Sequence, residues 1–167
     1  DQKNIKIIFH DLFTENKFSI SDLINVKNTS FSDDGNRMLV EYNDNKFSVY
    51  SLKDKSEIYS FGNELKTTEV IDEVSLSNNG DKVAFLLESD RKVEVFLHEL
   101  NSREQKLVHS YKKIRQGGGR SLSFANDKYL TVSMWGFSLR VCDLIDLESG
   151  SIKDLRAGLG GLASTPL

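Results

Sequence analysis

The chain has 167 residues, 38% of them hydrophobic, which suffices for one packed domain of ordinary size or for two very small ones. Its 22 basic and 25 acidic residues give a formal charge of 22 − 25 = −3, whereas a general nucleic-acid binder is usually basic. The single cysteine, Cys142, excludes an internal disulfide framework and a zinc site made of cysteines, and no apolar run approaches the ~20 residues of a membrane-spanning helix.

One pattern recurs along the chain: a short alternating apolar run, a polar turn, and a second β-rich run. The three copies cover residues 29–42, 74–87 and 122–134. The first two copies have the turns Ser-Asp-Asp-Gly (32–35) and Ser-Asn-Asn-Gly (77–80), whereas the third is one residue shorter and lacks the glycine. Each copy continues into a third strand, and further extended segments are expected at 18–23, 56–61, 105–111 and 151–155.

Two sets of equivalent positions give the period of this repeat. The first set, Phe31, Leu76 and Phe124, has spacings of 45 and 48 residues. The second set closes the third strands at Leu12, Leu52, Leu100 and Leu144, with a mean spacing of (144 − 12)/3 = 44 residues, which is typical of four-stranded propeller blades. The last closure has an alternative at Leu147: strand phase favours Leu144, and the following turn at 148–150 favours Leu147.

Helix is the competing secondary structure, and only 19–25 and 102–106 favour it. Both segments are too short to form stable helices alone. β-branched and aromatic residues dominate the periodic segments, so the sequence predicts an all-β fold.

These turns and strand ends resemble the WD-repeat β-propellers. The resemblance covers residues 5–155 and rests on the two Gly-containing turns and on strand ends such as His98-Glu99-Leu100 and Cys142-Asp143-Leu144. None of the four strand ends has the signature tryptophan of that family, and the Gly-His pair that usually precedes its first strand is absent from the sequence. The resemblance implies four-stranded antiparallel blades at 26–61, 70–111 and 120–155 and the end of another blade at 1–25. The glycine-rich composition of 156–167, which also holds the only proline, indicates a flexible tail or linker.

The blade that closes at Leu12 has no first and second strands within the sequence, so we expect an incomplete ring. The missing blades would come from the rest of a longer chain, another copy or another subunit, because an uncovered blade face exposes apolar surface. The first residue is Asp1, which suggests a processed product or a fragment.

The resemblance also implies structural roles for several residues. The leucines at the closures, Gly35 and Gly80 in the turns, and the acidic residues Asp11, Glu99 and Asp143 hold the blades, and Ser51 breaks the acidic pattern. The histidines His10 and His98 occupy the position of a packed tryptophan, so we expect neither a metal site nor a catalytic group there.

The loops at one face of such a blade array gather the candidate binding residues. They are Trp135, Arg115, Arg120, Arg91 and Asp90, and tryptophan and arginine are enriched at binding hot spots. Trp135 has an alternative role, covering the end of its own blade. The glycine-rich loop 115–120 is flanked by arginines, but it lacks the Lys-Ser/Thr ending of a nucleotide loop.

The sequence therefore predicts a non-enzymatic protein-interaction scaffold without a cofactor. We expect it to bind a protein partner and no nucleic acid, and to have no membrane span. The alternatives are an accessory or gating propeller of a larger enzyme such as a peptidase, and an oligomeric propeller that binds a small ligand or a sugar. Sparse cysteine favours a reducing, cytoplasmic location.

Overall fold

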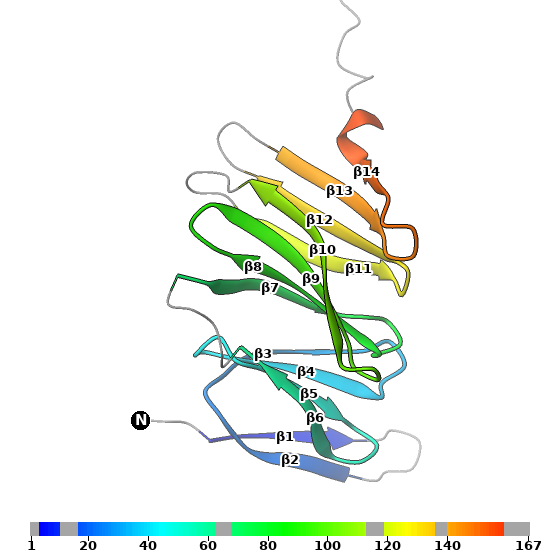
Figure 1. The fold of residues 1–167 in the computed structure, drawn as a ribbon. Coiled ribbons are helices and arrows are strands. Elements are labelled where there is room, and N and C mark those ends of the chain that lie inside the picture. The colour runs from blue at the N-terminus through cyan, green and yellow to red at the C-terminus, as the bar shows by residue number, and fades with distance from the viewer. Residues whose placement is uncertain (1–3, 11–16, 63–67, 113–118, 136–139, 159–167) are drawn as a thin grey trace, which may run out of the picture. The chain divides into compact units, whose positions relative to one another are not determined.

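The computed structural model describes residues 4–10, 17–62, 68–112, 119–135 and 140–158, and these residues form two compact units. Unit 1 comprises Asp1–Leu65 and unit 2 comprises Lys66–Leu167 (Figure 1). Apart from the short 3-10 helix η1 (Leu155–Gly158), every regular element in the described ranges is a β-strand. This confirms the predicted all-β fold.

Unit 1 contains a two-stranded and a four-stranded antiparallel sheet. The first pairs β1 (Asn4–His10) with β2 (Lys17–Ile24). The second has the order β3 (Val26–Phe31), β4 (Arg37–Tyr42), β5 (Phe47–Ser51) and β6 (Ser56–Phe61).

Unit 2 contains two four-stranded antiparallel sheets whose strands follow the chain order. One consists of β7 (Val70–Leu76), β8 (Lys82–Glu88), β9 (Lys92–Glu99) and β10 (Glu104–Lys112). The other consists of β11 (Arg120–Asn126), β12 (Tyr129–Trp135), β13 (Arg140–Asp146) and β14 (Ile152–Asp154). Four neighbouring strands in sequence order are the arrangement expected of a propeller blade.

The two Gly-containing turns are built in the same way. In each, the glycine N–H donates to the carbonyl of the serine: Gly35 to Ser32 at 3.0 Å, and Gly80 to Ser77 at 2.9 Å. The serine hydroxyl then accepts the first N–H of the next strand, from Arg37 at 3.0 Å and from Lys82 at 2.9 Å. Gly35 and Gly80 have φ values of 69° and 73°, which an L side chain rarely adopts.

The closing positions of the third strands are identified by a repeated backbone hydrogen bond. The N–H groups of Leu52, Leu100 and Leu147 donate, each at 2.9 Å, to the carbonyl groups of Asn36, Asp81 and Lys128. Leu147 is therefore the equivalent of Leu52 and Leu100, in place of Leu144, which lies within β13 opposite Thr131. The local turn chemistry gave the right position, whereas the strand phase was displaced by three residues. Asp11 and Leu12 lie outside the described residues.

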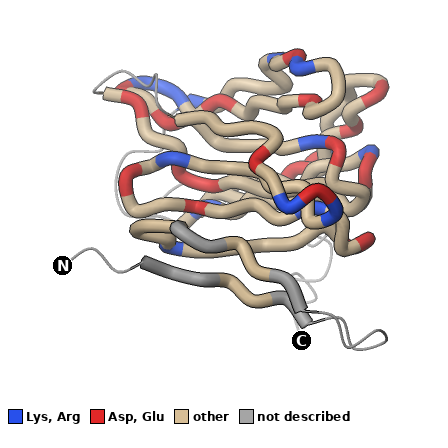
Figure 2. The backbone as a smooth tube through the Cα atoms, turned by 90° about the horizontal axis from the view of Figure 1, so that it is seen from below, with Lys and Arg blue, Asp and Glu red and all other residues tan. Residues whose placement is uncertain are grey.

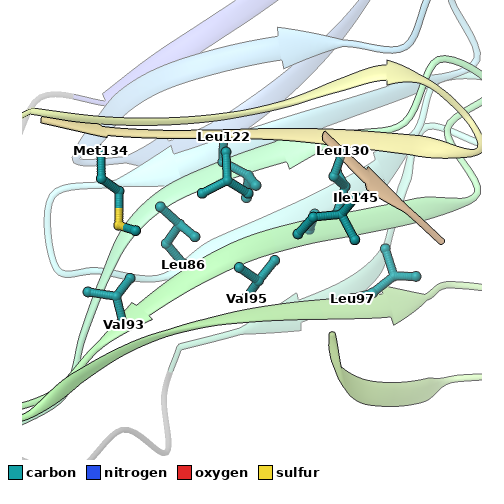
Figure 3. Close-up of a cluster of buried hydrophobic side chains, with 10 residues drawn as sticks. Leu86, Val93, Val95, Leu97, Leu122, Leu130, Met134 and Ile145 are labelled. Carbon is teal, nitrogen blue, oxygen red and sulfur yellow. The ribbon is translucent and has the colours of Figure 1, made fainter. Parts of the chain in front are cut away.

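Each unit has its own apolar core. In unit 1, Ile20 and Leu23 of β2 pack with Met38 and Val40 of β4 and with Leu52. In unit 2, one face of the β7–β10 sheet packs against one face of the β11–β14 sheet (Figure 3). The first face contributes Ala84, Leu86, Val93, Val95 and Leu97, and the second contributes Leu122, Leu130, Val132, Met134 and Ile145. This face-to-face stacking of twisted sheets is how neighbouring blades bury their apolar side chains.

Candidate functional site

Several strand ends of unit 2 meet at one end of its two sheets, because consecutive antiparallel strands return to the same edge. The turn after β8 contains Asp90 and Arg91, β11 begins at Arg120, and β12 ends at Trp135. We call Asp90, Arg91, Gly119, Arg120 and Trp135 the Trp135 end of unit 2. Four of these five, all except Gly119, are predicted binding residues. The fifth predicted binding residue, Arg115, lies outside the described residues.

Trp135 is 50% exposed and lies against the backbone of Gly119. Its N–H donates to the Gly119 carbonyl at 3.1 Å. A Cβ atom built on Gly119 would lie 2.1 Å from Cζ2 of the indole, so a side chain at this position would displace the ring. The tryptophan is thus held on a glycine while half of it faces solvent. Gly119 was predicted only as part of the glycine-rich loop 115–120, and its contact with Trp135 was not, although a glycine at a strand can mark a close approach of this kind.

Arg120 is an internal contact of unit 2. Its guanidinium donates to the carboxylate of Asp72 on β7 at 2.5 Å and also pairs with Glu88 on β8. The Arg120 side chain is only 16% exposed. Burial by itself would lower the pKa of Arg120, but the hydrogen bonds and charges of Asp72 and Glu88 raise it above its usual value.

Arg120 therefore ties the two sheets of unit 2 together. The same tie fixes the start of β11, and hence Gly119, beneath Trp135. The roles of Asp72 and Glu88 could not be predicted from the sequence. The two residues lie 48 and 32 positions before Arg120, and only the stacking of the two sheets brings them to it.

Asp90 and Arg91 are both exposed. The hairpin turn that carries them is closed by a hydrogen bond from the Ser89 N–H to the Lys92 carbonyl at 3.0 Å. This turn therefore presents one acid and one base to solvent on a defined backbone.

The opposite end of unit 2 is also tied across the sheets. The Asn79 N–H donates to a carboxylate oxygen of Asp127 at 3.0 Å, and the Lys82 ammonium donates to the Asp127 carbonyl at 3.1 Å. Between the two ends, the Tyr111 hydroxyl donates to Asp143 at 3.0 Å, and burial followed by the nearby carboxylate raises the pKa of Tyr111. Asp143 thus holds the two sheets together from the middle of β13.

The remaining titratable and sulfur-containing candidates lie within strands. Glu99 ends β9 opposite Lys82, and Cys142 is half-buried with its Sγ 3.8 Å from the Ser133 hydroxyl. His98 is buried, which lowers its pKa, and His10 lies on β1 opposite Lys17. Among the described residues, no group of three His, Cys, Asp or Glu side chains is placed to hold a metal ion.

In the view of Figure 2, acidic and basic residues are interspersed along the described backbone. None of the described segments forms a helix with the length and apolar character needed to cross a bilayer.

The fold resembles solved β-propellers over most of the chain. Dipeptidyl peptidase 4 from Porphyromonas gingivalis matches 92% of this chain with a TM-score of 0.67 and 13% identity. TolB from Acinetobacter baumannii matches 90% with a TM-score of 0.59 and 16% identity, and the WD40 repeats of RRP9 match 89% with a TM-score of 0.55 and 9% identity.

This chain spans 29%, 37% and 40% of those three chains, respectively. No family model matches the sequence, and no curated protein matches it either. The expected similarity to WD-repeat and related propellers is therefore confirmed at the level of the fold.

Proposed function

We propose that this chain is a non-catalytic propeller-type module that binds a protein partner through Trp135, with Asp90 and Arg91 at the rim of the contact. The observation that carries this proposal is the half-exposed Trp135 held against Gly119. A large aromatic ring that is already positioned loses little conformational freedom on binding, and tryptophan is among the commonest hot-spot residues.

The surrounding residues support a protein partner over a small ligand. A pocket of about 400 Å³ is lined by residues between 24 and 60, another of about 240 Å³ is lined by residues between 99 and 106, and neither of these contains Trp135. A protruding ring beside an exposed acid and base suits a flat protein surface, where the charged rim sets the association rate more than the affinity.

The test is a direct binding measurement with the partner recovered by affinity capture on the wild-type chain. Trp135→Ala should weaken that binding about tenfold or more, because a hot-spot aromatic is truncated. Leu107→Ala is the matched control, since Leu107 is 51% exposed on β10 and lies outside the proposed contact. Equal loss in both variants, or no loss in Trp135→Ala, would remove the Trp135 end from the binding surface.

A second candidate is an accessory propeller of a larger enzyme. The observation that favours it is the match to dipeptidyl peptidase 4, in which the aligned part makes up 29% of that chain. A hydrolase module encoded in the same polypeptide, together with peptidase activity that depends on this segment, would support this candidate over a separate scaffold.

A further inference from the structure

The pocket of about 400 Å³ in unit 1 has the size of a small-molecule site, for which about 300–1,000 Å³ is usual. Ile24 and Asn25, after the end of β2, lie at its rim, and the rest of its wall comes from β4, the β4–β5 turn, β5 and β6. The Asn25 carbonyl accepts hydrogen bonds from the backbone N–H and the side-chain amide of Asn43, at 2.9 and 3.0 Å. This rim is therefore fixed to the β4–β5 turn.

The pocket lies where the β3–β6 sheet has two small side chains in place of large ones. Ser48 of β5 is directly opposite Ser60 of β6, so both lie on one face of the sheet. When the β7–β10 sheet is aligned with it through the closing leucines, the equivalent pair is Phe96 and Leu107. There, Phe96 stacks on Phe85 with ring centroids 5.4 Å apart. The serines leave the corresponding space of unit 1 open and line it with hydroxyl groups.

The Ser48 hydroxyl is the most informative group of the wall. Ser48 is only 4% exposed, yet it lines the pocket. Within the described ranges, its hydroxyl makes no hydrogen bond to another residue. Buried polar groups are usually hydrogen-bonded, because an unpaired hydroxyl away from water costs free energy. A ligand with a hydrogen-bonding group would supply the partner that the sheet does not.

Two tyrosines and a glutamate add fixed acceptors to this wall. The hydroxyl oxygens of Tyr42 and Tyr50 lie 3.2 Å apart, and Tyr50 donates to a carboxylate oxygen of Glu57 at 3.3 Å. Each phenol has one proton, so Tyr42 donates to Tyr50. Burial, followed by the hydrogen bond to Tyr42, raises the pKa of Tyr50, which keeps its proton at neutral pH. The Tyr42 oxygen and the Glu57 carboxylate, which line the pocket, remain able to accept.

The charges of the pocket disfavour a charged ligand. The Lys46 ammonium pairs with the Asp44 carboxylate at 2.7 Å, so these two charges largely cancel. Glu57 carries the remaining charge and already accepts from Tyr50. An anion would meet two carboxylates, and a cation would meet the ammonium group. A neutral ligand rich in hydroxyl groups meets neither obstacle, and each of its hydroxyls can both donate and accept.

We propose that this pocket binds one neutral sugar ring, either free or at the end of a glycan. Neighbouring hydroxyls of the ring pair with Ser48, Ser60 and Glu57, and Ile24, which is 40% exposed, offers apolar contact at the rim. The described residues of this site belong to unit 1, whereas the proposed protein contact rests on Trp135 in unit 2. Either proposal can therefore fail without the other.

The test is an NMR titration of the isotope-labelled full chain with glucose, galactose, mannose, fucose and N-acetylglucosamine. At least one of these neutral sugars should shift the amide signals of 42–48 and 57–60 saturably. The expected dissociation constant is about 1–10 mM, because a ligand of this size makes few contacts. Glucuronate, an anion, and glucosamine, a cation, should bind about fivefold more weakly or less, since each brings an unpaired charge into the pocket.

Methyl glycosides of the sugars that bind distinguish the two sources of the ligand. Their anomeric oxygen is blocked, as it is in a glycan. Retained binding of the glycoside indicates the end of a glycan, and lost binding indicates a free sugar.

Two variants test the serine face. Ser48→Ala removes one hydroxyl with little change in volume and should weaken binding about fivefold. Ser60→Val removes the other hydroxyl, narrows the pocket and should weaken binding about tenfold. Ser121→Val is the matched control, because Ser121 is likewise an exposed serine within a strand but lies on β11 of unit 2, and it should leave binding unchanged. The titration of the wild-type chain does not depend on these variants folding.

Three outcomes would overturn the proposal. The first is the absence of shifts at 42–48 and 57–60 with all five neutral sugars at about 100 mM, well above the expected dissociation constant. The second is tighter binding of glucosamine or glucuronate than of any neutral sugar, which would show that charge governs the pocket. The third is sugar binding that Ser48→Ala and Ser60→Val both leave unchanged, which would place the sugar elsewhere.

Discussion

Replacing Gly119 by alanine tests how Trp135 is held. Gly119 does not have a positive φ, so in open space this change would stabilise the protein by about 0.4–1 kcal/mol through the unfolded state. The structure predicts that Gly119→Ala destabilises the protein instead, because the new Cβ would lie 2.1 Å from Cζ2 of Trp135. The indole must therefore leave its present contact.

The size of the effect follows from the area that Trp135 buries. A fully buried aromatic side chain covers roughly 150–250 Å². Because Trp135 is 50% exposed, the contact covers about 100 Å², which at ~25 cal/mol/Å² is about 2.5 kcal/mol as an upper limit. With partial relaxation, we expect Gly119→Ala to lower the free energy of unfolding by about 1–2 kcal/mol.

Trp135 is the only tryptophan, so its fluorescence reports on this contact alone. Gly119→Ala should shift the emission to longer wavelength, increase quenching by acrylamide and lower the urea midpoint. Ser121→Ala, an exposed change two residues along in β11, should alter none of these. A Gly119→Ala protein with wild-type emission and raised stability would refute the placement of the indole on Gly119.

Two further predictions concern other contacts. Arg120→Met should lower the free energy of unfolding of unit 2, measured in urea, because Asp72 and Glu88 lose their common cation. We expect a loss of about 1–3 kcal/mol, which lies between the contributions of exposed and of buried ion pairs. Lys128→Met, which breaks the exposed pair with Glu148, is its control and should cause no measurable change. In unit 1, hydrogen bonds from the Ser32 hydroxyl and the Asn36 N–H lower the pKa of Asp34. Its stabilising contribution is therefore present above the unfolded pKa, ~3.9, and is lost as the pH falls below it through the lower folded pKa. Asp34→Asn should make the acid limb of a stability–pH curve shallower at an unchanged turn geometry, since Asn79 makes the same contacts in the second turn. An acid limb identical to wild type would show that Asp34 makes no such contribution.

The strands and their order could be predicted because the signals are local. The first copy of the repeat, 29–42, ends with β4 at Tyr42, and the expected segment at 56–61 has the bounds of β6, since each strand begins after a polar turn with specific chemistry. The segments at 19–25 and 102–106, which had some helical character, lie mostly in β2 and at the start of β10. Pairing within a sheet determined the strand conformation of these short segments, because their own helix propensity was weak.

The contacts between sheets could not be predicted in this way. Nor could a backbone contact between distant segments of one sheet: Leu144 and Leu147 both suit a strand end, and the hydrogen bond from the Leu147 N–H to the carbonyl of Lys128, in the turn before β12, identifies Leu147. Arg120 is a similar case, since an arginine beside a glycine-rich loop suggests a ligand contact until Asp72 and Glu88 are placed next to it.

The two sheets of unit 2 are held together by different kinds of contact at their two ends, and this difference affects which residues can be substituted without separating the sheets. At the Asp127 end, backbone groups of Asn79 and Asp127 take part, so the tie depends on the conformation of both turns. At the Trp135 end, the tie consists of side chains only, from Arg120 to Asp72 and Glu88. The turn that carries Asp90 and Arg91 is closed by its own backbone bond and takes no part in that tie. Substitutions at Asp90, Arg91 and Trp135 should therefore change the proposed binding surface while Arg120 keeps the two sheets in place.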